Sequence, residues 1–72
     1  MTKTIQTEEY KKLVQKLKQA RIESGLTQID VAKKINRPQS YVSKVEAGEQ
    51  RIDVLELKKF AGLYKKDINF FI

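Results

Sequence analysis

The sequence contains neither cysteine nor histidine. These absences exclude a disulfide framework, a zinc site built from cysteine and histidine, and any serine or cysteine triad that depends on histidine. The residues that are present do not form a phosphate-binding loop, a cluster of metal ligands or a nucleophile paired with a base. We therefore expect a protein that is not an enzyme and that has no catalytic residues, no metal site, no cofactor and no small-molecule substrate.

Long apolar segments are also missing from the chain. Nowhere do about 18 apolar residues follow one another, as a membrane-spanning helix requires, and the first residues, MTKTIQTEEYKK, lack the apolar core of a signal peptide. The sequence therefore predicts a soluble, cytoplasmic protein with no membrane partner. The 72 residues leave room for one domain with a small core, which at this size needs tidy helix packing or oligomerisation to be stable.

Residues 26–48, LTQIDVAKKINRPQSYVSKVEAG, contain two short helical patterns separated by a break. In a helix-turn-helix, two helices cross closely at roughly 90 to 120° over a turn of roughly 3 or 4 residues, so a small residue such as Ala32 is needed at the crossing. Asn36 at the turn tolerates a positive φ, Pro38 stops the first helix and can open the second, and Gly48 suits a left-handed cap at its end. The residues at helical spacing on the inward faces are Val31, Ile35, Val42 and Val45. The pattern predicts a helix-turn-helix.

Further helices are predicted on both sides of this unit, so the expected fold is all-α with five helices. Side chains that can cap a helix stand at the expected starts, at Thr7, at Thr27 with Asp30, at Asp53 with Glu56, and at Asp67. The first helix ends at Ser24 and Gly25, Lys65 follows the fourth, and a last short helix, INFFI, reaches the terminus. The apolar residues expected to face the core are Tyr10, Leu13, Val14, Leu17 and Ala20 in the first helix, Val54, Leu57, Phe60, Ala61 and Tyr64 in the fourth, and Ile68, Phe71 and Ile72 in the last. Residues 1–6 are expected to be a flexible tail, and residues 7–72 a single domain.

The chain is basic, with a net charge of +6 and a pI near 9.7. Each lysine or arginine that neutralises a phosphate releases condensed counterions, so this charge suits a polyanionic partner. The positive residues are spread along the chain, however, and most lysines on helices only solvate an outer face. Charge alone leaves nucleic-acid binding open.

The strings GLTQ, VAKKI and QSYVSKVEAG resemble the phage repressor and Cro type of helix-turn-helix, the XRE family. The resemblance extends from about Leu13 to the end of the chain. It implies a lambda repressor-like domain that binds double-stranded DNA sequence-specifically and regulates transcription, as a repressor, a Cro-like protein or a controller-like protein. It also implies a homodimer, found on the nucleoid when bound to DNA, whose recognition helix is Pro38 to Ala47. The alternative is a helix-turn-helix module that acts mainly through protein contacts, such as an antitoxin.

The same resemblance implies which residues touch DNA. The expected base contacts are the outward residues of the recognition helix, Gln39, Ser40, Lys44 and Ser43, because glutamine can pair with adenine and lysine can reach guanine. The expected phosphate contacts are Gln28, Tyr41, Arg37 and Arg51. The alternative is that these are only polar surface residues. Arg37 takes a turn position where relatives often bury an aliphatic side chain, so either its stem covers the core while its head reaches a phosphate, or the turn is wetter than usual.

Three further residues have expected structural roles. Arg21 and Glu46 match positions that form a partly buried ion pair between the first and third helices of phage-repressor relatives. Phe70 stands where relatives usually carry a polar residue, so its ring is expected to anchor the dimer interface. The alternatives are that Phe70 only extends the core of a monomer, or that the fourth helix forms the interface.

Overall fold

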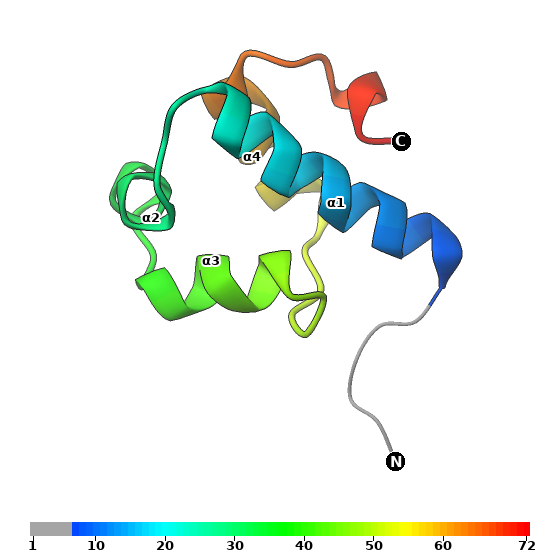
Figure 1. Cartoon of the computed structure of the whole chain (residues 1–72), viewed down its shortest axis with the longest axis horizontal. Helices are drawn as coiled ribbons and strands as arrows, with labels where there is room; N and C mark the ends of the chain where they lie inside the picture. The colour runs from blue at the N-terminus through cyan, green and yellow to red at the C-terminus, as the bar shows by residue number, and fades with distance from the viewer. Residues whose placement is uncertain (1–6) are drawn as a thin grey trace.

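The computed structural model describes residues 7–72, and the expected flexible tail, residues 1–6, lies outside this range. The described range contains four α-helices, one 3₁₀ turn and no strand. The helices are α1 (Glu8–Glu23), α2 (Gln28–Ile35), α3 (Gln39–Glu46) and α4 (Val54–Tyr64), and the 3₁₀ turn is η1 (Ile68–Phe70). The helices α2 and α3 form a corner, and both α1 and α4 pack against it (Figure 1). None of the helices in this range is long and apolar enough to span a membrane.

Side-chain caps start three of the helices where the sequence predicts them. The Thr7 hydroxyl accepts a hydrogen bond from the backbone of Tyr10 at the start of α1. Thr27 and Asp30 bond reciprocally at the start of α2, which is a complete capping box. The Asp53 carboxylate caps α4 by accepting from the backbone of the residue three positions later. These caps fix where each helix enters the core.

The corner between α2 and α3 is built from backbone conformations that the sequence indicates. Asn36 ends α2 with φ 60° in the left-handed region, and Gly48 follows α3 with φ 78°. The helix α3 begins one residue later than expected. Pro38 is its N-cap, with an extended ψ of 153°, rather than its first helical residue. Ala32 is 4% exposed, which leaves the space that a close helix crossing needs.

The core lies between all four helices and includes Phe71, the last aromatic residue of the chain. Its members are Leu17, Ala20, Val31, Ala32, Ile35, Val42, Val45, Leu57, Phe60, Ala61, Tyr64 and Phe71, and Val14 is buried beside them. Tyr10, Leu13 and Ile68 are only half-buried. The prediction of a core position is wrong for two residues, since Val54 is 67% exposed and Ile72 is 79% exposed. Val54 is the first residue of α4, and the chain there has not yet reached the packed layer.

The expected fifth helix is a 3₁₀ turn rather than an α-helix. Its backbone bonds run from Phe70 to Asp67 and from Phe71 to Ile68, three residues apart. The Asp67 carboxylate caps this turn by accepting from the backbone N–H of Asn69, two residues later, over 2.8 Å. The tighter turn changes the side-chain phase, so Phe71 enters the core while Ile72 points away from it.

The exposed side of α4 carries two residues that are unfavourable for their backbone positions. Gly62 lies in the helix interior, where glycine costs about 1 kcal/mol relative to alanine. Lys65 ends the helix with φ 58° in the left-handed region, which costs a residue with a Cβ about 1 kcal/mol or more. The last turns of α4 are therefore held by the buried side chains of Phe60, Ala61 and Tyr64 rather than by local backbone preference.

Candidate nucleic-acid interface

The outward face of α3 carries the four residues that the sequence nominates for base contacts. Val42 and Val45 are fully buried, with 0% exposure, and they fix the rotation of α3 about its own axis. The side chains on the other side of the helix are exposed: Gln39, Ser40, Ser43 and Lys44. The structure therefore brings all four together on one short, solvent-facing surface that carries one amide, two hydroxyls and one ammonium group.

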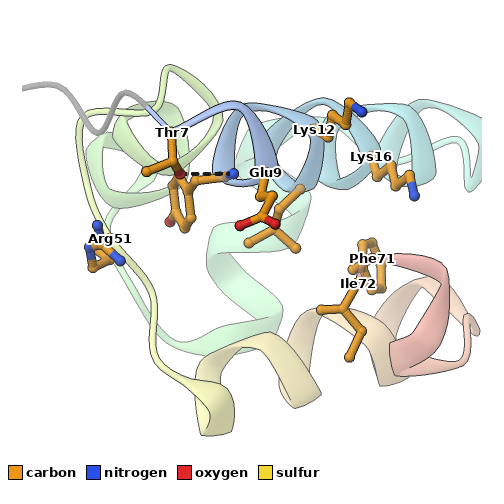
Figure 2. Close-up of a pocket in the computed structure, with 9 residues that line it drawn as sticks. Thr7, Glu9, Lys12, Lys16, Arg51, Phe71 and Ile72 are labelled. Atoms are coloured by element: carbon orange, nitrogen blue, oxygen red, sulfur yellow. Dashed lines mark hydrogen bonds between the residues drawn. The ribbon is translucent and has the colours of Figure 1, made fainter.

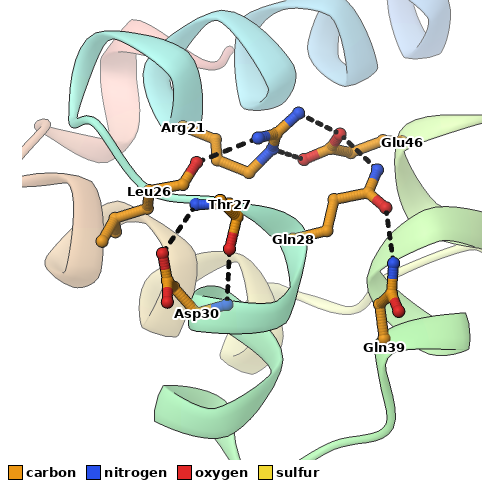
Figure 3. A network of polar contacts seen from close by, with 7 residues as sticks. All are labelled: Arg21, Leu26, Thr27, Gln28, Asp30, Gln39 and Glu46. Atoms are coloured by element: carbon orange, nitrogen blue, oxygen red, sulfur yellow. Dashed lines mark hydrogen bonds and ion pairs between the residues drawn. The ribbon is translucent and has the colours of Figure 1, made fainter.

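A chain of polar contacts links this surface to the inside of the protein (Figure 3). Gln39 Nε2 donates to Gln28 Oε1 over 3.5 Å, and Gln28 Nε2 donates to Glu46 Oε1 over 3.0 Å. Glu46 in turn holds Arg21. The amide of Gln28 thus donates to a buried carboxylate on one side and reaches the first residue of α3 on the other.

Arg21 and Glu46 form the ion pair that ties α1 to α3. Arg21 Nε lies 2.7 Å from Glu46 Oε2, and its terminal nitrogen donates to Glu46 Oε1 over 3.2 Å, so the pair is bidentate. The other terminal nitrogen donates to the carbonyl of Leu26 over 2.9 Å. The two side chains are only 13% and 5% exposed. Because both charges are largely removed from water, each depends on the other for its solvation.

Gln28 has a role that the sequence does not indicate. We expect it to contact a phosphate, yet its amide is already engaged by Glu46 and Gln39. The carbonyl oxygen has a second lone pair, and the amide nitrogen a second hydrogen, so contact with DNA remains compatible with both bonds. The structure places Gln28 as the link between the ion pair and the base-contact surface. No local pattern signals this link, because Arg21, Gln28 and Gln39 come from three separate helices.

Arg37 lies between α3 and α4 instead of pointing freely into solvent. One terminal nitrogen lies 2.8 Å from Glu56 Oε2, and the guanidinium stacks over the ring of Tyr41 at 4.8 Å. Its side chain is still 45% exposed. It is the guanidinium, and not the aliphatic stem, that covers the aromatic ring, so neither alternative for Arg37 describes the contact fully. Its head is shared with a carboxylate, and the remaining N–H groups are those that can reach a phosphate.

Glu56 is the buried partner that sequence reasoning missed. It is expected to complete a capping box with Asp53, but its carboxylate turns toward Arg37 and Lys59. The residue is 8% exposed, and its other carboxylate oxygen is buried without a hydrogen-bond partner. A signal was present, since Glu56 precedes Phe60 by four residues and so shares its face of α4. Half of the predicted capping box is therefore wrong.

Tyr41 packs against the core, with the guanidinium of Arg37 over its ring. The residue is half-buried against the core. Burial raises the pKa of its hydroxyl above the ordinary value of 10.0, and the nearby Glu56 carboxylate raises that pKa further. A tyrosine hydroxyl is protonated at neutral pH, and this shift moves it further from ionisation, so it can act as a hydrogen-bond donor.

Arg51 lies in the loop between α3 and α4 and is exposed. Its guanidinium lies 5.3 Å from the ring centroid of Tyr10, in the first turn of α1. The structure thus supports this arginine with an aromatic ring from a helix far away in the sequence.

Among residues 7–72, there is no group of three or more acidic side chains that could hold a metal ion.

Phe70, the expected dimer anchor, is half-buried rather than free. Its ring meets the ring of Phe71 edge-on at 5.1 Å. The ammonium groups of Lys66 and Lys16 lie 4.7 Å and 5.9 Å from its centroid. More exposed apolar side chains occur at the start of α4, where Val54 is 67% and Leu55 69% exposed.

Comparisons with known proteins agree on one family. The helix-turn-helix family profile matches residues 17–71. An XRE-family like protein from Pseudomonas syringae pv. tomato str. DC3000 is 39% identical, with a TM-score of 0.79, over 85% of this chain and 74% of that one. The wild-type restriction-modification controller protein C.Esp1396I is 27% identical, with a TM-score of 0.81, over 92% of this chain and 88% of that one. A point mutant of the same controller protein is 25% identical, with a TM-score of 0.81, over 93% and 86%.

Among curated protein sequences, none matches this chain. The profile match covers most of the chain, including the corner of α2 and α3 and the exposed surface of α3. The solved structures reproduce the same arrangement of helices. The chain therefore belongs to the XRE-type helix-turn-helix family of DNA-binding transcription regulators.

Proposed function

We propose that the protein reads a specific double-stranded operator with the exposed face of α3 and represses transcription from it. The observation that carries this proposal is the chain of contacts from Arg21 through Glu46 and Gln28 to Gln39. An exposed glutamine is normally free to adopt several rotamers, and ordering it costs binding free energy. Here the contact with Gln28, over 3.5 Å, favours one orientation of the Gln39 amide before DNA arrives, as suits a residue that pairs with one base.

The chemistry of the surface suits the major groove. Gln39 can donate to and accept from the N7 and N6 edge of adenine, and Lys44 can donate to O6 and N7 of guanine. Ser40 and Ser43 are small and can donate or accept, so they allow close approach of α3 to the bases. Together these four side chains form the proposed base-contact set.

The proposed phosphate contacts surround this set. Gln28 stands at the first residue of α2, where backbone N–H groups without partners favour an anion. Tyr41 contributes a protonated hydroxyl, and Arg37 and Arg51 contribute guanidinium groups that are each stacked on a tyrosine ring. Phosphate contacts of this kind fix the position of the protein on the duplex but carry no sequence information.

The salt dependence of binding tests the proposed function. Two arginine contacts to phosphate give a slope of log affinity against log salt near −1.8. We therefore expect the affinity for a mixed-sequence duplex to fall about tenfold per protomer when NaCl rises from about 50 to about 200 mM. Fluorescence anisotropy of a labelled duplex measures this change. An affinity that does not respond to salt would contradict the proposal and favour a module that acts through protein contacts, such as an antitoxin.

We further propose that the protein acts as a homodimer that uses Phe70. A two-fold dimer can place its recognition helices about 34 Å apart, one turn of B-DNA, to read a near-palindromic site. Phe70→Lys is expected to lower the dimer fraction in analytical ultracentrifugation and to weaken operator binding, with the far-UV helical signal unchanged. The comparison variant is Leu55→Lys on the exposed start of α4. A dimer lost only in Leu55→Lys would move the interface to α4.

A further inference from the structure

Tyr10, in the first turn of α1, contacts both sides of the loop residue Arg51. Its hydroxyl accepts a hydrogen bond from the backbone N–H of Ile52 over 3.2 Å and donates to the carbonyl of Gln50 over 3.4 Å. These are the two peptide groups that flank the Cα of Arg51. Its ring also lies 5.3 Å below the guanidinium. One side chain therefore holds the backbone before the arginine, the backbone after it and the charged head.

The position of Tyr10 is itself held by the cap of α1. Its backbone N–H donates to the Thr7 hydroxyl, which caps α1, over 3.1 Å. Figure 2 shows this bond and Arg51 beside the same end of α1. The beginning of the loop is held separately, because the backbone N–H groups of Glu49 and Gln50 both donate to the carbonyl of Lys44. The Tyr10 hydroxyl supplies the corresponding support at Arg51, near the middle of the loop.

We propose that Tyr10 is a positioning residue for DNA binding: it holds Arg51 in the orientation that contacts a phosphate. This inference rests on the proposed function and extends the DNA-binding apparatus to α1, which carries none of the residues nominated for DNA contact. A guanidinium on an unsupported loop loses side-chain and backbone freedom when it binds a phosphate. The two hydrogen bonds and the stacked ring remove part of that freedom beforehand, so binding is stronger without any contact between Tyr10 and DNA.

The test is a double-mutant cycle between Tyr10→Phe and Arg51→Ala. Tyr10→Phe keeps the ring beneath the guanidinium and removes only the hydroxyl. We expect it to weaken binding about threefold, the lower part of the range for one hydrogen bond, equally on a selected operator and on a mixed-sequence duplex. Arg51→Ala is expected to weaken binding on both and to lower the salt slope by about 1. In the Arg51→Ala background, Tyr10→Phe is expected to change nothing.

The matched control is Tyr64→Phe, which removes a tyrosine hydroxyl that is buried and has no hydrogen-bond partner. It is expected to leave DNA affinity and salt slope unchanged. A readout without DNA is hydrogen exchange at the Ile52 amide, which Tyr10→Phe is expected to accelerate about tenfold or more and Tyr64→Phe is not. Measuring well below the unfolding temperature of each variant separates positioning from global destabilisation.

The possible outcomes distinguish this inference from the proposed function. A steeply salt-dependent parent with an unaffected Tyr10→Phe variant overturns the positioning role alone. An equal loss from Tyr10→Phe with and without Arg51 also overturns it, because the tyrosine then acts by another route. A parent chain that does not bind either duplex overturns both the function and the inference.

Discussion

Glu46→Ala is expected to lower the free energy of unfolding by about 3 to 5 kcal/mol, because it leaves the guanidinium of Arg21 buried without its counter-charge. Arg21 is 13% exposed, so water can solvate it only poorly once the carboxylate is gone. The same substitution removes the acceptor of Gln28. Arg21→Ala is expected to lower the free energy of unfolding by a similar amount, because it leaves the carboxylate of Glu46 buried without its counter-charge. Urea unfolding followed by far-UV circular dichroism measures both.

Two comparisons make this result specific to the ion pair. Glu49→Ala removes an exposed glutamate close by in the sequence and is expected to change stability by less than about 0.5 kcal/mol. The double variant Arg21→Ala with Glu46→Ala is expected to lose less than the sum of the single losses, since no unpaired charge is left behind. Single variants as stable as the parent would mean that the bidentate geometry contributes nothing to the fold.

Gln39→Ala is expected to weaken binding to the selected operator by about 1 to 3 kcal/mol while changing binding to a mixed-sequence duplex little. A base contact contributes to one sequence, whereas phosphate contacts contribute to all sequences. The loss should fall in the upper part of this range if the bond to Gln28 orders the amide beforehand. Anisotropy titrations of the two duplexes at one salt concentration measure the difference.

The control for this prediction is Gln15→Ala, which removes an exposed glutamine from α1. It is expected to leave both affinities unchanged. Equal losses of affinity for the two duplexes after Gln39→Ala would indicate that this residue contacts the DNA backbone rather than a base. The operator itself comes from a selection among random duplexes with the parent protein.

The helix-turn-helix corner could be predicted from the sequence because its determinants are local. The hydroxyl and carboxylate at Thr27 and Asp30, the asparagine at a left-handed turn and the glycine after α3 each act within a few residues of their own position. The inward apolar residues follow the helical period, so they identify the buried side of each helix. These signals also fix which residues of α3 point outward.

The predictions that are wrong or incomplete concern residues whose surroundings are set by distant parts of the chain. Val54 follows the apolar period of α4, but within residues 7–72 no other element covers the start of that helix, and Val54 is 67% exposed. The capping pattern predicts a cap role for Glu56, yet its buried carboxylate pairs with the partly exposed guanidinium of Arg37, 19 residues earlier. The links from Gln28 to Glu46 and from Tyr10 to Ile52 join residues 18 and 42 positions apart. Periodicity and capping rules contain no information about such pairs.

The residues at the end of α4 affect how many destabilising substitutions the fold of this protein can tolerate. Gly62 and Lys65 are both exposed and neither packs into the core, so the roughly 2 kcal/mol that they cost together is independent of the DNA-facing surface. Domains of this size have a total stability of only about 5 kcal/mol, and most substitutions lower it. A helix former at position 62 and a glycine at position 65 would widen that margin. A lineage or an engineered variant with these two changes would tolerate destabilising substitutions on α3 and so reach a wider range of DNA sequences.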